Sequence, residues 1–321
     1  MIKYFGITLL LLQTHVYASQ EAEFEQWKKN YAKQAAKRGL NQAFVLDQLK
    51  DITFDPEVVK KDQNQVILSK EKDYQEFIKR WLRSDPSRAE IGKEKLKEHH
   101  DLLQKIEKKY GVDKEVIVSL WGVETFYGKI TGSYDIISSL ATLTFEGRRK
   151  KFFEIQLNAA LRLLQQNHIT RDKLKGSWAG ATGQCQFMPS NFNVYAQDFD
   201  GDGKKDIWTN HADIFASIAN FLKKVGWKKN AEIGSLAYKN TNQKLQANQY
   251  RTPEQYNQLG FKSLEGQKIT GNWKRRRFAE IPMKNSPVVL RGSNYKPLLN
   301  WNNSSLFAAF NILLINEFKK D

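Results

Sequence analysis

The chain has one cysteine, Cys185, among its 321 residues. A single cysteine excludes an internal disulfide, so side-chain packing, with a bound ion at most, must hold the fold together. A cysteine nucleophile would need a histidine base, and neither His168 nor His211 stands at a spacing that indicates such a pair. We therefore expect Cys185 to be a small buried side chain.

Long hydrophobic runs are also lacking. The longest N-terminal run, Phe5 to Leu12, is well short of the roughly 20 residues that span a bilayer. It follows Lys3 and precedes Val16-Tyr17-Ala18, which is the pattern of a secretory signal over residues 1–18 with cleavage after Ala18. An uncleaved membrane anchor is the alternative, and a lipoprotein anchor would need a cysteine at the new N-terminus. We expect an exported protein of the periplasm or cell envelope without a lipid anchor.

Acidic residues are few relative to basic ones. The chain has 51 Lys and Arg against 35 Asp and Glu, a net charge of +16. Such a charge attracts nucleic acid, anionic lipid, or the acid-bearing peptides and polymers of a cell wall, and export favours the wall. The excess lies in short runs such as Lys60-Lys61 and Arg275-Arg276-Arg277, which are usually solvated faces. Without a nucleic-acid-binding motif, no nucleic-acid partner is expected.

Apolar residues make up 40% of the chain, enough for a substantial core. Apolar spacings of three and four predict helices over residues 19–110, after the signal. Residues 111–230 hold the Gly-rich turns and polar clusters where chemistry is expected. Residues 231–321 begin with a polar stretch, followed by short strands at 278–283 and 287–291 and a closing helix at 305–318. The predicted fold class is mainly α with a small C-terminal β element.

A glutamate stands on the apolar face of the helix predicted over residues 112–127. At about 100° per residue, Glu124 projects between the directions of Leu120 and Ile117. Burial disfavours the charged form, so the pKa of Glu124 should rise and leave the group protonated often enough to act as a general acid. A structural ion pair with Arg148 or Arg149 is the alternative, and the pattern alone leaves both open.

Residues 175–190 combine small and neutral polar side chains. The small residues at 179–183 allow close approach of a backbone or a sugar ring, while Ser177 and Gln186 offer neutral donors and acceptors. Sugar sites add aromatic faces, for which the candidates are Tyr127, Trp178, Phe187 and Tyr195. Close helix packing over a patch of small residues is the alternative interpretation.

The segment from Asp198 to Asp206 matches the first nine positions of an EF-hand-like calcium loop, with acids at one, three, five and nine and glycine at six. Thr209 replaces the glutamate of position twelve, so the affinity should be lower unless Asp213 closes the site. The alternative is an acidic turn without an ion, and no organic cofactor is indicated. We expect a structural Ca²⁺ or Na⁺ held by Asp198, Asp200, Asp202, the Lys204 carbonyl, Asp206 and Asp213.

Three motifs together resemble the lytic murein transglycosylase B family. They are Trp121-Gly122-Val123-Glu124-Thr125-Phe126-Tyr127-Gly128, Gly176-Ser177-Trp178-Ala179-Gly180-Ala181, and Gln186-Phe187-Met188-Pro189-Ser190. The resemblance runs from about residue 24 to 318 and implies a lysozyme-like helical core with an added cation loop. It also implies cleavage of the bond between N-acetylmuramic acid and N-acetylglucosamine in peptidoglycan glycan strands.

The resemblance implies a reaction without water. Glu124 would protonate the leaving oxygen, the substrate's N-acetyl group would stabilise the cationic intermediate, and Glu124 would then take the proton of the 6-hydroxyl to leave a 1,6-anhydro end. A second catalytic carboxylate is not required in such a substrate-assisted scheme. A lysozyme-type hydrolase using the same glutamate and an inactive wall-binding scaffold are the rival functions.

The same resemblance assigns binding roles. Ser177 and Gln186 would hydrogen-bond the sugar, and Arg148 and Arg149 would contact its acidic substituents. Asn302 matches a C-terminal family segment in which Trp301 and Phe307 replace usual tyrosines. We expect a monomer, with wall-synthesis proteins as further candidate partners.

Overall fold

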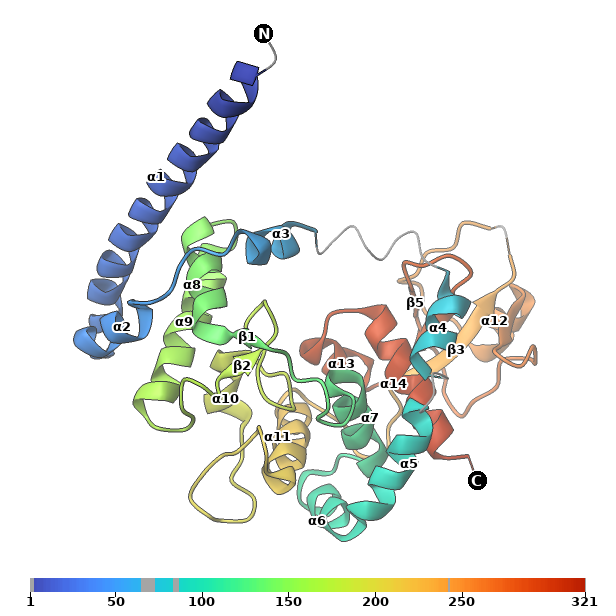
Figure 1. Ribbon diagram of the computed structural model, residues 1–321. Coiled ribbons are helices and arrows are strands. Elements are labelled where there is room, and N and C mark those ends of the chain that lie inside the picture. Colours follow the sequence, from blue (N-terminus) through green and yellow to red (C-terminus); the bar gives the residue numbers. More distant parts are fainter. Residues whose placement is uncertain (1–2, 65–72, 83–86, 242, 321) are drawn as a thin grey trace. The chain divides into compact units, whose positions relative to one another are not determined.

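Figure 1 shows the computed structural model of the chain, which describes residues 3–64, 73–82, 87–241 and 243–320. The chain divides into two units, each discontinuous in sequence. The first unit comprises Met1–Gln65 and Thr131–Val194, and the second comprises Val66–Ile130 and Tyr195–Asp321. The secondary structure is predominantly helical with small antiparallel sheets, which confirms the predicted fold class.

Helices α8 and α9 pack against each other in the first unit. Its aromatic core joins distant segments, because Phe24 is fully buried and lies edge-on to Phe54 and Phe145 at centroid distances of 6.0 and 5.1 Å. Helix α1 runs through the predicted cleavage point after Ala18, so the signal stays a prediction. The elements are α1 Lys3–Ala36, α2 Gln42–Leu49, α3 Pro56–Asn64, β1 Tyr134–Asp135, α8 Ile136–Glu146, α9 Lys150–Gln165, β2 Lys175–Gly176 and α10 Pro189–Tyr195, whose last residue belongs to the second unit.

Helix α7 lies in the helical core of the second unit and contacts α5, α6, α11 and α14. Every residue of α7 from Val116 to Gly122 is buried, as expected for a helix covered on most sides. The helices are α4 Tyr74–Leu82, α5 Arg88–Glu98, α6 His100–Tyr110, α7 Lys114–Thr125, α11 His211–Lys224, α12 Pro253–Gln258, α13 Tyr295–Trp301 and α14 Ser305–Phe318. No helix among the described residues is long and apolar enough to cross a membrane.

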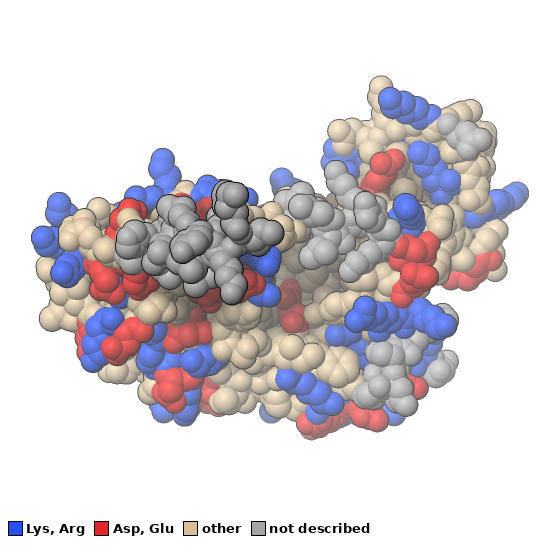
Figure 2. All heavy atoms as spheres, turned by 45° about the horizontal axis from the view of Figure 1, so that its top comes forward, with Lys and Arg blue, Asp and Glu red and all other residues tan. Residues whose placement is uncertain are grey.

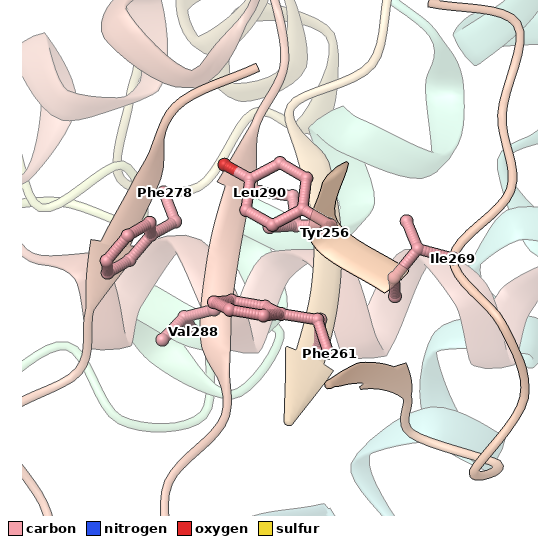
Figure 3. Packing of buried hydrophobic residues seen from close by; sticks show 7 residues of the cluster. Tyr256, Phe261, Ile269, Phe278, Val288 and Leu290 are labelled. Atoms are coloured by element: carbon pink, nitrogen blue, oxygen red, sulfur yellow. The ribbon is translucent and has the colours of Figure 1, made fainter. Parts of the chain in front are cut away.

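An antiparallel sheet of order β4-β3-β6-β5 belongs to the second unit. Its strands are β3 Gly234–Lys239, β4 Phe261–Ser263, β5 Phe278–Glu280 and β6 Val288–Arg291. Figure 3 shows the hydrophobic cluster on this sheet, in which Tyr256 of α12 packs with Phe261, Phe278 and Leu290. Both predicted strands and the closing helix are confirmed, although β5 ends at Glu280, three residues earlier than predicted, and β6 begins at Val288. The polar stretch before them also folds, with its few apolar side chains entering this cluster.

Charged side chains of both signs are mixed on the surface. Figure 2 shows Lys and Arg side chains distributed among Asp and Glu on the face in view. Several ion pairs are short-range and exposed, as in the Lys50–Asp47 pair at 2.9 Å. Such exposed pairs contribute little to stability. The excess of Lys and Arg over Asp and Glu therefore gives the surface an attraction for anions.

Candidate active site

Helix α7 is fixed to its neighbours by hydrogen bonds as well as by packing. The buried Ser119 hydroxyl donates to Asn311 Oδ1 of α14 at 2.8 Å. Near the C-terminal end of α7, Arg88 Nε of α5 donates to the carbonyl oxygen of Gly122 at 3.0 Å. A cation bonded to a terminal carbonyl stabilises a helix end. These contacts hold the last turn of α7, which carries Glu124, in one position.

The helix ends two residues earlier than the sequence pattern predicts. Phe126 and Tyr127 adopt φ values of 51° and 58°, so the backbone leaves α7 in the left-handed region. The turn directs Tyr127 into the core, where it is 5% exposed and its hydroxyl donates to the Arg88 carbonyl at 2.6 Å. A Cβ on Gly122 would collide with the Tyr127 ring. This burial disagrees with the predicted sugar contact of Tyr127, because the ring face is covered by protein.

Glu124 is partly buried and bonded to an aromatic side chain. Trp301 Nε1 donates to Glu124 Oε1 at 2.8 Å. Burial raises the pKa of Glu124 from 4.5 to about 7, although the hydrogen bond from Trp301 acts in the opposite direction. A carboxyl group with a pKa near neutrality is present in both protonation states at physiological pH, as proton transfer in both directions requires.

Trp301 is the residue that the sequence motifs did not single out as a site residue. Its ring lies edge-on to Phe221 of α11 at 4.8 Å, and Phe221 contacts the Tyr195 ring at 4.4 Å. The rings of Tyr195, Phe221 and Trp301 therefore contact one another in a row within the second unit, and Trp301 is bonded to Glu124. The sequence did hold a signal for Trp301, because it stands where the resembled family usually has a tyrosine. Indole N–H and phenol O–H are both hydrogen-bond donors, so either side chain can bond the glutamate. Phe307, the other altered position, is 7% exposed and has no such donor.

The remaining predicted residue of the second unit is Asn302. It follows α13 directly as the C-terminal cap, its side chain is exposed, and its N–H donates to the Leu298 carbonyl at 3.2 Å. Because this side chain is exposed, it is available to a ligand, and it directly follows Trp301 in the sequence. Its substrate contact stays a prediction.

In the first unit, Ser177 and Gln186 stand on one tightly bonded loop. The Ser177 hydroxyl accepts from the Ala181 N–H at 3.0 Å, and Gln186 Nε2 donates to the carbonyl oxygens of Thr131 and Gly183 at 2.9 and 3.0 Å. Backbone bonds between Thr182 and Phe187 close the loop between them. The Ser177 proton and Gln186 Oε1 are therefore the groups left to bind a ligand.

The glycines of this loop serve close backbone packing. A Cβ on Gly176 would collide with the Ala181 carbonyl, and one on Gly132 would collide with the Gly176 carbonyl. These two glycines thus let non-helical backbone segments approach closely. Of the four predicted aromatic faces, Phe187 is also buried, while Trp178 and Tyr195 are partly exposed.

Arg148 and Arg149 share one buried carboxylate in the first unit. Arg148 Nε donates to Asp62 Oδ2 at 2.8 Å, and Arg149 forms an ion pair with the other oxygen. Asp62 is 1% exposed, whereas the two arginine side chains are 42% and 36% exposed. The pair thus satisfies a buried charge and still presents guanidinium surface to solvent. The contact of these arginines with acidic substituents of the sugar stays a prediction.

The predicted cation loop brings three carboxylates together. Asp198, Asp200 and Asp202 place one oxygen each within 4.8 Å of one another. Gly201 and Gly203, with φ values of 81° and 86°, donate their N–H groups to the two oxygens of Asp198 at 2.7 and 2.9 Å. Three hard oxygen donors at this spacing fit a Ca²⁺-sized ion. The Lys204 side chain is exposed, which suits a role through its carbonyl.

Asp206 and Asp213 use their oxygens to close the same loop. Asp213 is fully buried and accepts the N–H groups of Phe199 and Asp206, both at 2.7 Å. Asp206 accepts the N–H groups of Trp208 and Thr209 at 2.8 Å. These bonds give both residues a structural role, and their ligation of a cation stays a prediction.

The comparison with known proteins decides the family. The model of the transglycosylase SLT domain matches residues 23–314. The chain belongs to the transglycosylase SLT domain family. Membrane-bound lytic murein transglycosylase B of Escherichia coli is 32% identical over 235 residues, which cover 71% of this chain and 64% of that protein. The match thus spans less than two thirds of this relative, and it confirms the resemblance inferred from the motifs.

Solved structures of family members have the same fold. SltB3 from Pseudomonas aeruginosa in complex with NAG-NAM-pentapeptide superimposes with a TM-score of 0.79 at 33% identity, covering 93% of this chain and 80% of that one. The Escherichia coli lytic transglycosylase Slt35 in complex with calcium gives a TM-score of 0.75 at 26% identity, with coverages of 90% and 92%.

Replacing Trp301 by phenylalanine is expected to raise the pKa of Glu124 above that of the wild type. The variant loses the N–H donor that stabilises the carboxylate, while burial remains. Because the acid form starts the reaction inferred below, the decline of kcat/KM at high pH should move to higher pH. A pH-rate profile measures this, with Trp301→Tyr as a donor-retaining variant and Trp27→Phe as a control. An unmoved profile in Trp301→Phe would contradict the role of the hydrogen bond.

Proposed function

We propose that the chain is a lytic transglycosylase that cleaves the bond between N-acetylmuramic acid and N-acetylglucosamine in peptidoglycan glycan strands. The observation that carries the proposal is Glu124, a partly buried carboxyl group with a pKa of about 7 and an indole N–H on one oxygen. The family membership supports the same activity, since the Escherichia coli relative is named a lytic murein transglycosylase.

The inferred mechanism assigns two proton transfers to Glu124. With Trp301 donating to Oε1, the other carboxyl oxygen carries the proton to the leaving glycosidic oxygen. The bond to the anomeric carbon then breaks, and the substrate's own acetamido group stabilises the cationic sugar. The Glu124 carboxylate next takes the proton of the 6-hydroxyl, whose oxygen bonds to the anomeric carbon. The proton count closes without water, and Glu124 returns to its acid form.

The loop of the first unit is suited to hold an N-acetyl sugar. A hydroxyl donor at Ser177 matches an acetamido carbonyl, and an amide acceptor at Gln186 matches an acetamido N–H. Arg148 and Arg149 carry exposed guanidinium surface that suits the carboxylates of a peptide-bearing sugar. In the second unit, the exposed Asn302 side chain offers a polar contact to a sugar, and the partly exposed rings of Trp301 and Tyr195 offer apolar faces.

The product distinguishes this function from its rivals. Peptidoglycan sacculi digested with the full chain should release muropeptides that end in 1,6-anhydro sugar, as measured by mass spectrometry. Reducing ends without anhydro sugar would show that water is the acceptor and that the chain is a lysozyme-type hydrolase. Binding to sacculi without release of fragments would show a wall-binding scaffold.

The proposed substrate implies a location in the cell envelope. The N-terminal pattern of Lys3, an apolar run and Ala18 supports export by a signal sequence. Glycan strands are then the main partner, and the net charge of +16 favours their acid-bearing peptides.

Removal of a bound cation should destabilise the second unit. Asp198, Asp200 and Asp202 would hold a structural Ca²⁺, with further oxygens from Lys204, Asp206 and Asp213, and the relative solved with calcium supports this assignment. Three carboxylates this close repel one another without an ion. Chelation is therefore expected to lower the melting temperature by about 3 °C or more. Asp200→Asn should reduce the response to chelator, and equal melting temperatures with and without Ca²⁺ would contradict the site.

A further inference from the structure

Arginine side chains gather in a cavity of the second unit that the proposed reaction does not use. The cavity has a volume of about 260 Å³, and four of its lining residues are arginines. None of the described residues that line it is acidic. The basic run at 275–277, expected from sequence to be a solvated face, instead contributes a side chain that is only 9% exposed, Arg276. The lining residues are Tyr250, Trp273, Arg275, Arg276, Arg277, Arg291, Gly292 and Ser293.

Two of these arginines face each other across neighbouring strands. Phe278 of β5 pairs with Leu290 of β6, and the adjacent Arg291 N–H donates to the Arg277 carbonyl at 2.8 Å. The antiparallel register therefore sets Arg277 opposite Arg291. Like charges in opposed positions destabilise a strand pair. A negative group between them would remove this repulsion.

Two guanidinium N–H groups of the lining arginines are buried and have no acceptor within the described part of the chain. Arg276 Nη2 donates to Glu232 at 2.7 Å, while Arg276 Nη1 is buried without a hydrogen-bond partner. Arg291 Nε is buried and unpartnered in the same way. Nearly all buried polar groups in proteins are hydrogen-bonded, and a charged donor left unpaired is especially unfavourable. An anionic group bound against these two guanidinium groups would supply the missing acceptor.

Aromatic rings fix the arginine planes. The guanidinium carbon of Arg276 lies 4.6 Å from the Trp273 ring centre, and that of Arg277 lies 4.8 Å from the Tyr250 ring centre. Stacked guanidinium groups keep a defined orientation and lose little freedom when they bind. Glu232, the carboxylate bonded to Arg276, is 64% exposed and balances one of the four charges. The cavity is thus lined by positively charged guanidinium groups, two of which are held in place by stacking on aromatic rings.

We infer that this cavity binds an oxyanion group and that its ligand in the cell wall is a carboxylate of a peptidoglycan stem peptide. The assignment of the cell-wall source rests on the proposed function. The volume is below the roughly 300 Å³ at which small-molecule pockets begin, so a single anionic group fits it better than a disaccharide. Guanidinium groups bind carboxylates in a paired geometry. The pentapeptide bound by SltB3 is the kind of ligand that carries such a group at its end.

The test measures binding without cleavage, in full-length chain carrying Glu124→Gln. A synthetic stem pentapeptide with a free C-terminal carboxylate and the same peptide with a C-terminal amide are titrated calorimetrically at one ionic strength. The free acid should bind at least about tenfold more tightly than the amide, as expected for a paired charge-assisted contact. Arg291→Gln should remove this preference, and Arg291→Lys should weaken it because the forked donor is lost. Arg80→Gln, an exposed arginine on α4, is the matched control.

Inorganic phosphate distinguishes the two sources of an oxyanion. Phosphate binding that is lost in Arg291→Gln, without any preference for the free-acid peptide, would support the cavity and overturn the stem-peptide assignment. Equal binding of all ligands in Arg291→Gln and Arg80→Gln would overturn the cavity as an anion site. These results are independent of the products formed from sacculi, so the two proposals fail separately.

A melting experiment separates loss of binding from loss of folding. In low-salt buffer without added anion, Arg291→Gln removes one of two facing charges and should melt at or above the wild-type temperature. A lower melting temperature in that buffer would contradict the repulsion on which the inference is based.

Discussion

Replacing Glu124 by glutamine is expected to lower the rate of release of anhydro-ended muropeptides by about 10³-fold or more. Proton transfer by one positioned group contributes roughly 10²–10⁴-fold, and here a single carboxyl group performs two transfers. Glutamine has the same shape and accepts the Trp301 hydrogen bond through its oxygen, but it neither donates nor accepts the transferred proton. The loss should therefore appear in kcat, with KM little changed.

The measurement is initial-rate kinetics on solubilised glycan strands, with products identified by mass spectrometry. Glu94→Gln provides a matched control, because Glu94 is an exposed glutamate on α5 of the same unit. Wild-type rates are expected for that control. Turnover retained by Glu124→Gln within tenfold of the wild type would falsify the assignment of Glu124 as the proton carrier.

The fold was predictable where the pattern of side chains is local. Apolar spacing located α7, and the bounds predicted for the closing helix are those of α14, Ser305–Phe318. The strands β5 and β6 followed from short apolar runs. Strand β3 was not predicted, because Gly234–Lys239 lies in a polar stretch and is stabilised by pairing with β6, about fifty residues later. Such non-local pairing leaves little trace in the sequence of one strand.

The site was predictable in its central group and less so in its surroundings. Helical geometry correctly indicated that Glu124 is shielded from solvent and that burial raises its pKa. The sugar contact predicted for Tyr127 rested on its aromatic ring alone, and the left-handed turn after Thr125 directs that ring into the core. The hydrogen bond of Trp301 and the shared carboxylate of Asp62 join segments far apart in the chain. Only the folded structure brings these partners together.

Glu124 should also make the protein less stable as the pH rises from about 4.5 to 7. Its pKa is about 7 in the folded protein and 4.5 as the ordinary value, so folding favours the protonated form. Below pH 4.5 both states are protonated, and the stability of the fold is complete. As the pH rises, the unfolded chain loses this proton before the folded chain does, which favours unfolding. Above pH 7 the loss reaches its full value of about 3 kcal/mol.

Comparison with Glu124→Gln isolates this effect, because glutamine does not titrate and other groups titrate alike in both proteins. Denaturant unfolding should give nearly equal free energies at pH 4, whereas the variant should be more stable by about 3 kcal/mol at pH 8. For Glu94→Gln, the difference from the wild type should not change over this range, since that side chain is exposed. A Glu124→Gln difference that stays constant from pH 4 to pH 8 would mean that the carboxyl group titrates normally. Stability gained together with loss of cleavage is what a group kept for chemistry predicts.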